Sequence, residues 1–472
     1  MIAYDGRRPI TSMARTLAWM GLMAVWAPLA AGTSLDDYVA APDGSYKWEL
    51  VNTVSTDKLD MLVVDMTSQT WRTPDEVDRT AWQHWVTILV PKQVDHSTAL
   101  MFIGGGSNGR PAPSRPNEML AQFALATRSV VAEVHQIPNQ PLVFAGEERK
   151  RVEDEMIAYT WDKFRETGDA MWPARLPMTK AVVRAMDTVQ TLLKQERSLE
   201  VQDFVVAGGS KRGWTTWATA AVDPRVKAIV PIVIDVLSVR PSMKHHHAAY
   251  GFWAPAIGDY VEMNLMEWLD TPEFDALMAI ADPYSYRKRY TMPKFLINSA
   301  GDQFFLPDSS QFYFDDLPGE KYLRYVPNSD HGLDDTDAPE SFLAWYAAIL
   351  NDVQRPKFSW KTSVSLGEAT VRVKTRSQPA QVNLWQATNP TARDFRLESF
   401  GPHWHSVRLE PARKGLYVAK VPAPAEGWTA LFVELVFDPG SEAVPAPFKF
   451  TTNVVVVPDV LPFPETDEKE GS

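Results

Sequence analysis

The sequence predicts an α/β protein, in which a mostly parallel sheet with helices on both faces is followed by a β-sandwich-like domain. From residue 98 onward, short apolar segments alternate with longer amphipathic segments, which is typical of parallel strands joined by crossover helices. Near residue 355 the pattern changes to short apolar segments separated by proline and glycine, which is typical of an all-β sandwich. We therefore expect one domain at 33–354 and a second at 355–462.

The N-terminus has the layout of a secretory signal peptide. Arg7, Arg8 and Arg15 precede an apolar run from Leu17 to Ala30, and small residues follow that run. The alternative is a membrane anchor, but the run is short for a bilayer span. We expect residues 1–32 to be cleaved, which predicts a periplasmic or secreted protein with no integral membrane anchor in its mature form.

The composition argues against several classes of function. The 472-residue chain has a net charge of −12, and we expect no nucleic acid partner because such proteins usually concentrate lysine and arginine. The absence of cysteine excludes disulfides, thiolate zinc sites and a cysteine nucleophile. We expect no cofactor, and the sequence leaves the oligomeric state open.

The first domain is expected to begin with two twisted strands and then to alternate strands with helices. The predicted strands are Leu59–Thr67, Trp82–Pro91, Thr98–Ile103, Ser129–Val134, Phe204–Ala207, Lys227–Asp235, Lys294–Asn298 and Tyr322–Val326. The predicted helices are Asn117–Thr127, Met178–Leu193 and a segment from just after Ser210 to Asp223. In the second domain we expect strands at Val364–Val373, Gln381–Ala387, Ser406–Leu409, Leu416–Val421, Ala430–Phe437 and Phe448–Val457, followed by a disordered acidic tail at 463–472.

A segment rich in aromatic residues, 238–292, separates two of the predicted parallel strands. We interpret it as a cap over a substrate pocket, with ordinary core packing as the alternative. The side chains expected at the pocket are His246, His247, Tyr250 and Trp253 of this cap, together with Asp235 and Asn139. The three consecutive histidines at 245–247 would point in different directions along a helix or strand, so we expect no metal site there.

An apolar run that ends at Gly208-Gly209-Ser210 is typical of a nucleophile elbow, in which a strand turns sharply into a helix and exposes a serine. The usual elbow has glycine two residues after the serine, but Arg212 occupies that place and Gly213 follows it. Taken alone, the segment also fits an ordinary glycine-rich turn. Arg212 either narrows the pocket, holds a substrate acid or marks a weakened enzyme.

Ser210, Asp302 and His331 each follow an apolar strand, and they occur in the chain order of α/β-hydrolases. One edge of a parallel sheet would therefore carry all three. A serine hydroxyl becomes a strong nucleophile when an imidazole accepts its proton, and a carboxylate fixes the tautomer of that imidazole. Alone, Asp302 fits a turn and His331 a solvated acidic loop, but together the three predict a serine hydrolase.

Two further segments bear on that chemistry. The main-chain N–H groups of Lys211 and of Gly105 or Gly106 are expected to stabilise the oxyanion, because one follows the nucleophile and the others lie in a glycine loop after a strand. That loop lacks the ending of a phosphate-binding loop. The acidic run at 153–155 is either a helix start, where carboxylates are favourable, or a recognition site for a substrate amino group.

Several motifs carry a family resemblance. They are Leu35–Val39, Tyr46–Leu50, Gly104–Asn108, Ile157–Trp161, Pro177–Ala181, the Ser210 elbow, His246–Gly251 and Asn328–Gly332. With these motifs the chain resembles the PhoPQ-activated pathogenicity-related (PqaA-type) family of exported bacterial proteins. The resemblance implies an α/β-hydrolase fold with a serine elbow and a C-terminal β domain.

Two functional hypotheses follow. The first is an exported serine hydrolase of the peptidase or esterase type, which forms an acyl-enzyme with a small-molecule or peptide substrate. The second is a non-enzymatic or degenerate binding protein that keeps the hydrolase scaffold and is linked to virulence or envelope stress. Arg212, in place of the usual glycine, favours the second hypothesis.

Overall fold

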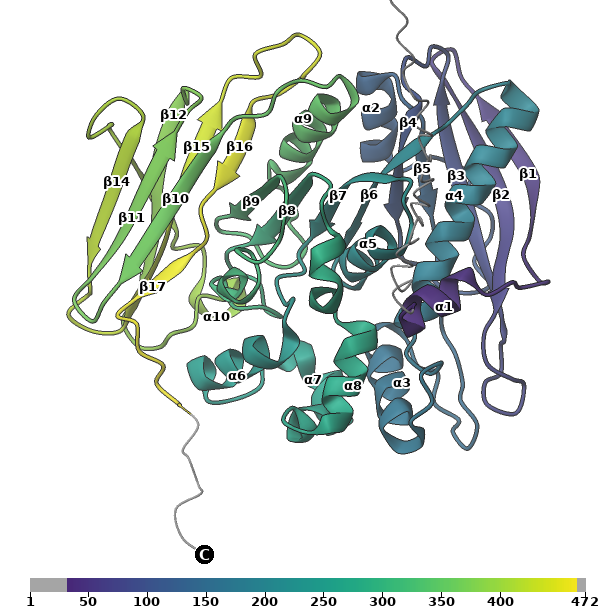
Figure 1. Ribbon diagram of the computed structural model, residues 1–472, viewed down its shortest axis with the longest axis horizontal. Coiled ribbons are helices and arrows are strands. Elements are labelled where there is room, and N and C mark those ends of the chain that lie inside the picture. The colour runs from purple at the N-terminus through teal and green to yellow at the C-terminus, as the bar shows by residue number, and fades with distance from the viewer. Residues whose placement is uncertain (1–31, 465–472) are drawn as a thin grey trace, which may run out of the picture. The chain divides into compact units, whose positions relative to one another are not determined.

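A 14-stranded sheet organises the part of the chain that the structure, a computed structural model, describes, residues 32–464 (Figure 1). In sheet order its strands are β1 (Lys47–Ser55), β2 (Leu59–Thr70), β3 (Ala81–Pro91), β5 (Val131–Val134), β4 (Thr98–Ile103), β6 (Asp203–Gly209), β7 (Val226–Ile232), β8 (Lys294–Ser299), β9 (Lys321–Val326), β16 (Phe448–Thr451), β15 (Trp428–Phe437), β12 (Gln381–Asn389) and β13 (His405–Arg408), while β17 (Val455–Val457) pairs with β15. The strands β5, β4, β6, β7, β8 and β9 are parallel to one another, and β5 and β9 pair antiparallel with the flanking strands β3 and β16. This arrangement confirms the predicted α/β-hydrolase fold class.

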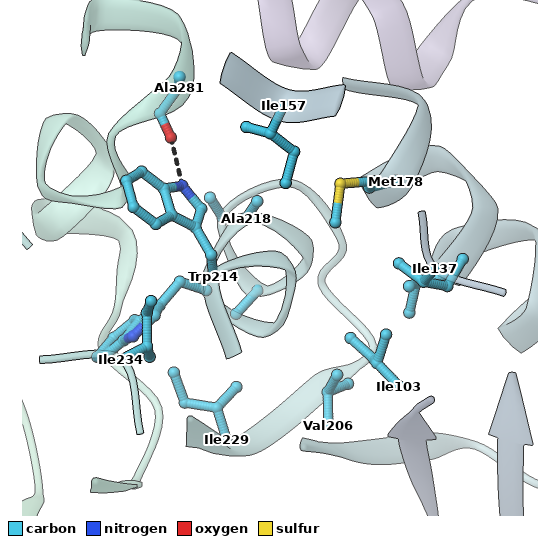
Figure 2. Packing of buried hydrophobic residues seen from close by; sticks show 14 of the residues in the cluster. Ile103, Ile137, Ile157, Met178, Val206, Trp214, Ala218, Ile229, Ile234 and Ala281 are labelled. Carbon is cyan, nitrogen blue, oxygen red and sulfur yellow. Dashed lines mark hydrogen bonds between the residues drawn. The ribbon is translucent and has the colours of Figure 1, made fainter. Parts of the chain in front are cut away.

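Helices cover both faces of the parallel region. On one face α4 (Arg175–Arg197) and α5 (Lys211–Val222) pack on the sheet and α1 (Ser34–Ala40) packs on these two helices, and on the other face α2 (Glu118–Thr127) and α9 (Ala338–Leu350) pack on the sheet. Successive side chains of β4 point to opposite faces of the sheet: Met101 packs in the core under α4 and α5, and Leu100 packs in the core under α2 and α9. Figure 2 shows the packing around α5, including Trp214, whose indole N–H donates to the Ala281 carbonyl at 2.6 Å.

The predicted cap segment connects β7 to β8 and is mostly helical. It contains α6 (Val239–Tyr250), α7 (Gly258–Glu262), α8 (Pro272–Ala281) and the short 3-10 helices Pro255–Ile257, Leu265–Trp268 and Pro283–Arg289. Another helix, α3 (Glu153–Thr167), contacts α7 and α8. A further 3-10 helix, Ser309–Phe312, follows β8, and a short helix α10 (Leu397–Phe400) lies in the C-terminal region.

The C-terminal sheet continues the central sheet, because β16 pairs with β9 through Thr451 and Leu323. A second, three-stranded sheet of β10 (Phe358–Val364), β11 (Glu368–Thr375) and β14 (Leu416–Pro422) packs on β15 and its neighbours. Buried side chains from both layers, such as Val371 of β11 and Val433 of β15, share one hydrophobic core. Residues 33–464 accordingly belong to one compact unit.

Two expected strands of this region were wrong in extent. The expected strand Val364–Val373 crosses the turn at 365–367, so the segment forms the end of β10 and most of β11. The expected strand Phe448–Val457 is interrupted at 452–454 and forms β16 and β17. In both cases apolar residues continue across a break in pairing, and composition alone does not reveal such a break.

The ends of the chain fall largely outside the described residues. All but one residue of the expected signal peptide and all but two residues of the expected tail lie there. Between residues 32 and 464, no helix combines the length and apolar character that crossing a membrane requires.

Candidate active site

Ser210 occupies the sharp turn between β6 and α5. Its backbone angles, φ 56° and ψ −126°, lie in a sparsely populated region that is costly for a residue with a side chain. The flanking glycines make this turn possible. A Cβ on Gly208 would lie 2.9 Å from the main chain of Arg212, and a Cβ on Gly213 would lie 2.9 Å from the Gly208 carbonyl oxygen. The turn therefore has the geometry of a nucleophile elbow.

Asp302 and His331 lie together in the loops that follow β8 and β9. Nδ1 of His331 is 2.8 Å from Oδ2 of the buried Asp302, and the other carboxylate oxygen accepts from the Phe304 N–H at 2.7 Å. Nε2 of His331 is buried and has no hydrogen-bond partner among residues 32–464. In this structure it is therefore not bonded to Ser210; such bonds are often long without substrate and tighten when substrate binds.

The C-terminal region supports these two loops. The main-chain N–H of Leu397 donates to the Gly301 carbonyl at 2.9 Å, and Asn328 exchanges two hydrogen bonds of 2.9 Å with the main chain of Trp404. Gly301 is required because a Cβ there would lie 2.6 Å from the Ser329 carbonyl oxygen. The chain after residue 390 thus fixes the loops that carry Asp302 and His331.

The expected oxyanion donors lie on two neighbouring segments. Lys211 is the first residue of α5, and Gly105 and Gly106 follow β4, which pairs directly with β6. In the described part of the chain, the main-chain N–H groups of these three residues donate to no acceptor, whereas the carbonyls of Gly105 and Gly106 accept from the Gln136 main chain and the Gln140 side chain. The free N–H groups are of the type that stabilises an oxyanion.

Arg212 turns away from the pocket and joins the elbow to the glycine loop. Its Nε donates to the Ile137 carbonyl at 2.6 Å, and its Nη2 pairs with Oε1 of Glu153 at 2.6 Å. Its guanidinium lies against Gly105, where a Cβ would come within 2.7 Å of Nη2. Arg212 therefore neither narrows the cavity beside Ser210 nor lines it.

Glu153 is the centre of this network. It also pairs with the Lys211 ammonium at 2.9 Å and accepts from Gln140, whose amide donates to the Gly106 carbonyl at 3.1 Å. Burial raises the pKa of Glu153, but Arg212 and Lys211 outweigh it and lower the pKa to about 2. Its φ of 49° is unusual for a glutamate. The carboxylate thus connects both segments that carry the expected oxyanion donors.

A mostly apolar cavity of about 60 Å³ opens beside Ser210. Apolar side chains from α3, α5 and the cap line it, together with Phe304 and Phe305, which contact the His331 ring at centroid distances of 4.4 and 6.0 Å. Representative members are Trp161, Trp214, Val239, Met243 and Phe274. The cavity therefore lies next to both Ser210 and the aromatic side chains that pack on His331.

The polar side chains of the cavity gather at Lys211. The Lys211 ammonium pairs with Asp154 at 2.9 Å, and Asp154 accepts from the Tyr260 hydroxyl at 2.9 Å. Arg175, 3% exposed, donates to the Lys211 carbonyl at 3.0 Å and stacks on Trp214. Burial lowers the pKa of Arg175, and within residues 32–464 no carboxylate lies within ion-pair distance of it. Arg175 was not predicted, because one arginine among the several basic residues of an amphipathic helix carries no local signal.

The acidic run at 153–155 begins a helix, as one of its two interpretations holds, and it also forms ion pairs that neither interpretation included. Its residues begin α3, as the helix interpretation requires. Glu153 and Asp154 nevertheless point to Lys211, so the cations of the elbow already occupy them. Glu155 pairs with Arg149 and Arg151 instead and has no contact with the elbow.

The structure does not place the six expected pocket residues at the cavity. The first half of α6 reaches the cavity, while its second half packs elsewhere. His246 is buried, accepts from the Ala254 N–H at 3.1 Å and packs on Trp253 and Tyr250; His247 also packs on Trp253. Burial lowers the pKa of His246 to about 3.

Asp235 and Asn139 are buried and do not line the cavity beside Ser210. Asp235 accepts from the hydroxyls of Tyr313 at 2.5 Å and Tyr325 at 2.6 Å. Burial raises the pKa of Asp235 to about 7, against the effect of these two hydrogen bonds. Asn139 is fully buried and donates to the Gln83 carbonyl. Both residues are structural in position.

The three consecutive histidines diverge, as expected from their spacing. His245 contacts Asp308 at 3.0 Å, and His246 contacts the Ala254 main chain. Within the described ranges, no group of three or more histidine or acidic side chains is arranged to hold a metal ion.

The comparisons with known proteins agree with the predicted family. Residues 35–396 match the sequence model of the family described as PhoPQ-activated pathogenicity-related protein. The chain belongs to this family. This PhoPQ-related chain is 39% identical over 459 residues to autocrine proliferation repressor protein A of Dictyostelium discoideum, and the alignment covers 92% of each chain.

Among solved structures, the PhoPQ-related chain is similar to acetyl xylan esterase 1 from Thermoanaerobacterium sp., with a TM-score of 0.46, 14% identity, and coverage of 68% of this chain and 92% of that one. It is also similar to an acetyl xylan esterase from Paenibacillus sp. R4, with a TM-score of 0.44, 15% identity, and coverage of 63% and 86%.

Proposed function

We propose that this PhoPQ-related protein is a serine hydrolase that acts through an acyl-enzyme. One observation carries the proposal: Ser210 is held in an elbow conformation at an apolar cavity, and an Asp302–His331 pair follows β8 and β9 of the same sheet, with Nε2 of His331 unpartnered among residues 32–464. A serine, a carboxylate and an imidazole in this chain order constitute the machinery of acyl transfer.

In the proposed reaction, Nε2 of His331 accepts the hydroxyl proton of Ser210 as its oxygen attacks the substrate carbonyl carbon. Asp302 holds Nδ1–H and stabilises the imidazolium that forms. The N–H groups of Lys211 and of Gly105 or Gly106 bind the oxyanion. His331 then returns the proton to the leaving group, and a water activated by His331 hydrolyses the acyl-enzyme.

We propose that the acyl group enters the apolar cavity. Each buried methylene contributes about 0.8 kcal/mol, so kcat/KM should rise about fourfold per added carbon until the cavity is full. A volume of about 60 Å³ favours short acyl groups. In a series of p-nitrophenyl esters we expect butyrate to exceed acetate and octanoate to fall below butyrate. A steady increase to octanoate would contradict this placement of the acyl group.

A fluorophosphonate probe tests the chemistry itself. Wild-type protein should be labelled covalently, and Ser210→Ala should not. Asp302→Asn should label more slowly by a factor of about 10⁴, because the imidazole then adopts the wrong tautomer. The control is Ser329→Ala, which removes the hydroxyl of a buried serine in the His331 loop and should leave Ser210 open to labelling. Unlabelled but folded wild-type protein would favour the binding-protein hypothesis.

A further inference from the structure

A basic cleft lies at one end of the three-stranded sheet, far along the chain from the candidate active site. Its volume is about 660 Å³, and it lies where β10 begins, β11 ends and β14 begins. Five cationic side chains line it, and no acidic residue does so. These are Lys357, Lys374, Arg376, Arg413 and Lys414.

These five side chains are all exposed, and none forms an ion pair within the described part of the chain. Elsewhere in this structure, exposed arginines commonly pair with a neighbouring carboxylate, as Arg149 does with Glu262. Between residues 355 and 422 the sequence has twelve lysines and arginines but four acidic residues, in a chain whose net charge is −12. Such asymmetry within an acidic protein indicates a surface for an anionic partner.

The outer face of the same sheet continues the positive charge away from the cleft. Lys361 of β10 lies directly opposite Arg372 of β11, and neither pairs with a carboxylate within residues 32–464. Like charges directly opposite each other destabilise a sheet. The next outward-facing pair toward the cleft is Ser359 of β10 and Lys374 of β11. The outer face therefore carries cationic side chains, together with the Ser359 hydroxyl, up to the cleft.

We propose that the cleft and this face bind a linear anionic polysaccharide, through its sulfate or carboxylate groups. Lysine and arginine supply the charge, and the hydroxyls of Ser359 and Thr375 supply further hydrogen bonds. The proposal does not depend on the chemistry of Ser210, because none of its residues lines the cavity beside that serine.

The residues around the cleft favour a polysaccharide over a nucleic acid or an anionic membrane. Phe358, the aromatic residue of the cleft, is half-buried and already stacks with Trp360, Phe437 and Phe450, so it is poorly placed to stack on a nucleic acid base. Membrane binding usually combines cations with inserted apolar side chains. The highly exposed Leu366 lies on the turn between β10 and β11, at the opposite end of these strands from the cleft.

Heparin oligosaccharide is a suitable probe, because it is a linear polymer dense in sulfate and carboxylate groups. We expect full-length protein to bind it in titration calorimetry at about 50 mM salt, with affinity falling as salt rises. The combined substitution Lys374→Glu, Arg376→Glu and Lys414→Glu should weaken binding by at least about tenfold. A matched variant, Lys58→Glu, Lys150→Glu and Lys194→Glu, changes three exposed lysines outside the cleft by the same total charge and should bind within about threefold of wild type.

Circular dichroism and urea unfolding establish that both variants are folded, and their unfolding midpoints should be close to that of wild type. The proposal fails if wild-type protein does not bind heparin at low salt, or if the matched variant loses as much affinity as the cleft variant. It also fails if anionic phosphatidylglycerol vesicles or duplex DNA bind to the cleft and heparin does not.

Discussion

Arg212 stands two residues after Ser210, where a nucleophile elbow usually has glycine, and the structure shows what this arginine contacts. Its guanidinium lies between Gly105 and Glu153 and donates to the Ile137 carbonyl. The elbow and the glycine loop are therefore joined by charge-assisted hydrogen bonds, which are stronger than neutral ones. Arg212 thus helps to hold the two segments that carry the expected oxyanion donors, and this structural role accounts for the departure without a loss of activity.

Substitution of Glu153 tests this positioning role. Glu153→Gln keeps the size of the side chain but removes the charge that holds Lys211 and Arg212. We expect the maximal rate of labelling by a fluorophosphonate to fall by about tenfold, equivalent to about 1.4 kcal/mol, with little change in probe affinity.

The matched control for this prediction is Glu155→Gln, on the same first turn of α3. Glu155 pairs with Arg149 and Arg151 and has no contact with the elbow, so its labelling rate should stay close to that of wild type. Equal losses in the two variants would assign the effect to the stability of α3 and not to the elbow.

The sequence was sufficient to predict the sharp turn at Ser210 and the proximity of Asp302 and His331, because each residue follows an apolar strand and the ends of parallel strands meet. It was not sufficient to find the contact of Glu153 with Arg212, which lies 59 residues away along the chain. No local pattern specifies such a contact. The positions of His246 and Tyr250 were likewise not predictable from local sequence. Aromatic residues of this kind often line pockets, but these two pack on each other and do not line the cavity.

At the scale of elements, β7 and β9 are linked through Asp235. The carboxylate follows β7 and accepts from Tyr325 on β9 and from Tyr313. The bounds of β4 were predicted to the residue, because its apolar run stops at a glycine. The link through Asp235 was not predicted. The sequence placed Asp235 inside the expected strand Lys227–Asp235, whereas β7 ends before it at Ile232. A buried carboxyl with a raised pKa is the consequence of the observed geometry.

Asp235 should make stability depend on pH. Its pKa rises from 3.8 to about 7 on folding because the carboxyl is buried. The protonated form is favoured in the folded protein, so its contribution is complete below about pH 4 and is lost as pH rises through 7, by up to about 1.4 kcal/mol per pH unit. Asp235→Asn removes this loss, so the stability of wild type relative to the variant should fall between pH 4 and 7.

Urea unfolding across that range measures the difference. Asp57→Asn, a substitution of an exposed aspartate, serves as the control and should show a flat difference from wild type. A flat difference for Asp235→Asn as well would show that the carboxyl is ionised throughout, held in that form by the two tyrosine hydroxyls.

At the scale of the whole molecule, the C-terminal strands complete the central sheet. Arg324 of β9, 2% exposed, pairs with Glu434 of β15 and with Asp337, and β16 covers the edge of β9. Removing the C-terminal region would leave a buried guanidinium without one of its two carboxylates and an open sheet edge. Both changes are costly or promote aggregation.

We therefore expect a chain that ends at residue 354 to be insoluble or unfolded, whereas residues 33–464 unfold in one cooperative transition by calorimetry. A chain that ends at residue 458 keeps every strand and should remain folded, which controls for truncation itself. A soluble, cooperatively folded chain of residues 33–354 would show that the region before residue 355 is independent of the rest.

The hydrogen bonds from Leu397 to Gly301 and between Trp404 and Asn328 have a consequence for the order of synthesis. The loops that carry Asp302 and His331 leave the ribosome before Leu397 and Trp404, which support them. Until those later residues are present, both loops lack these hydrogen bonds. The mutual position of Asp302 and His331 therefore depends on a part of the polypeptide that is translated after both of them.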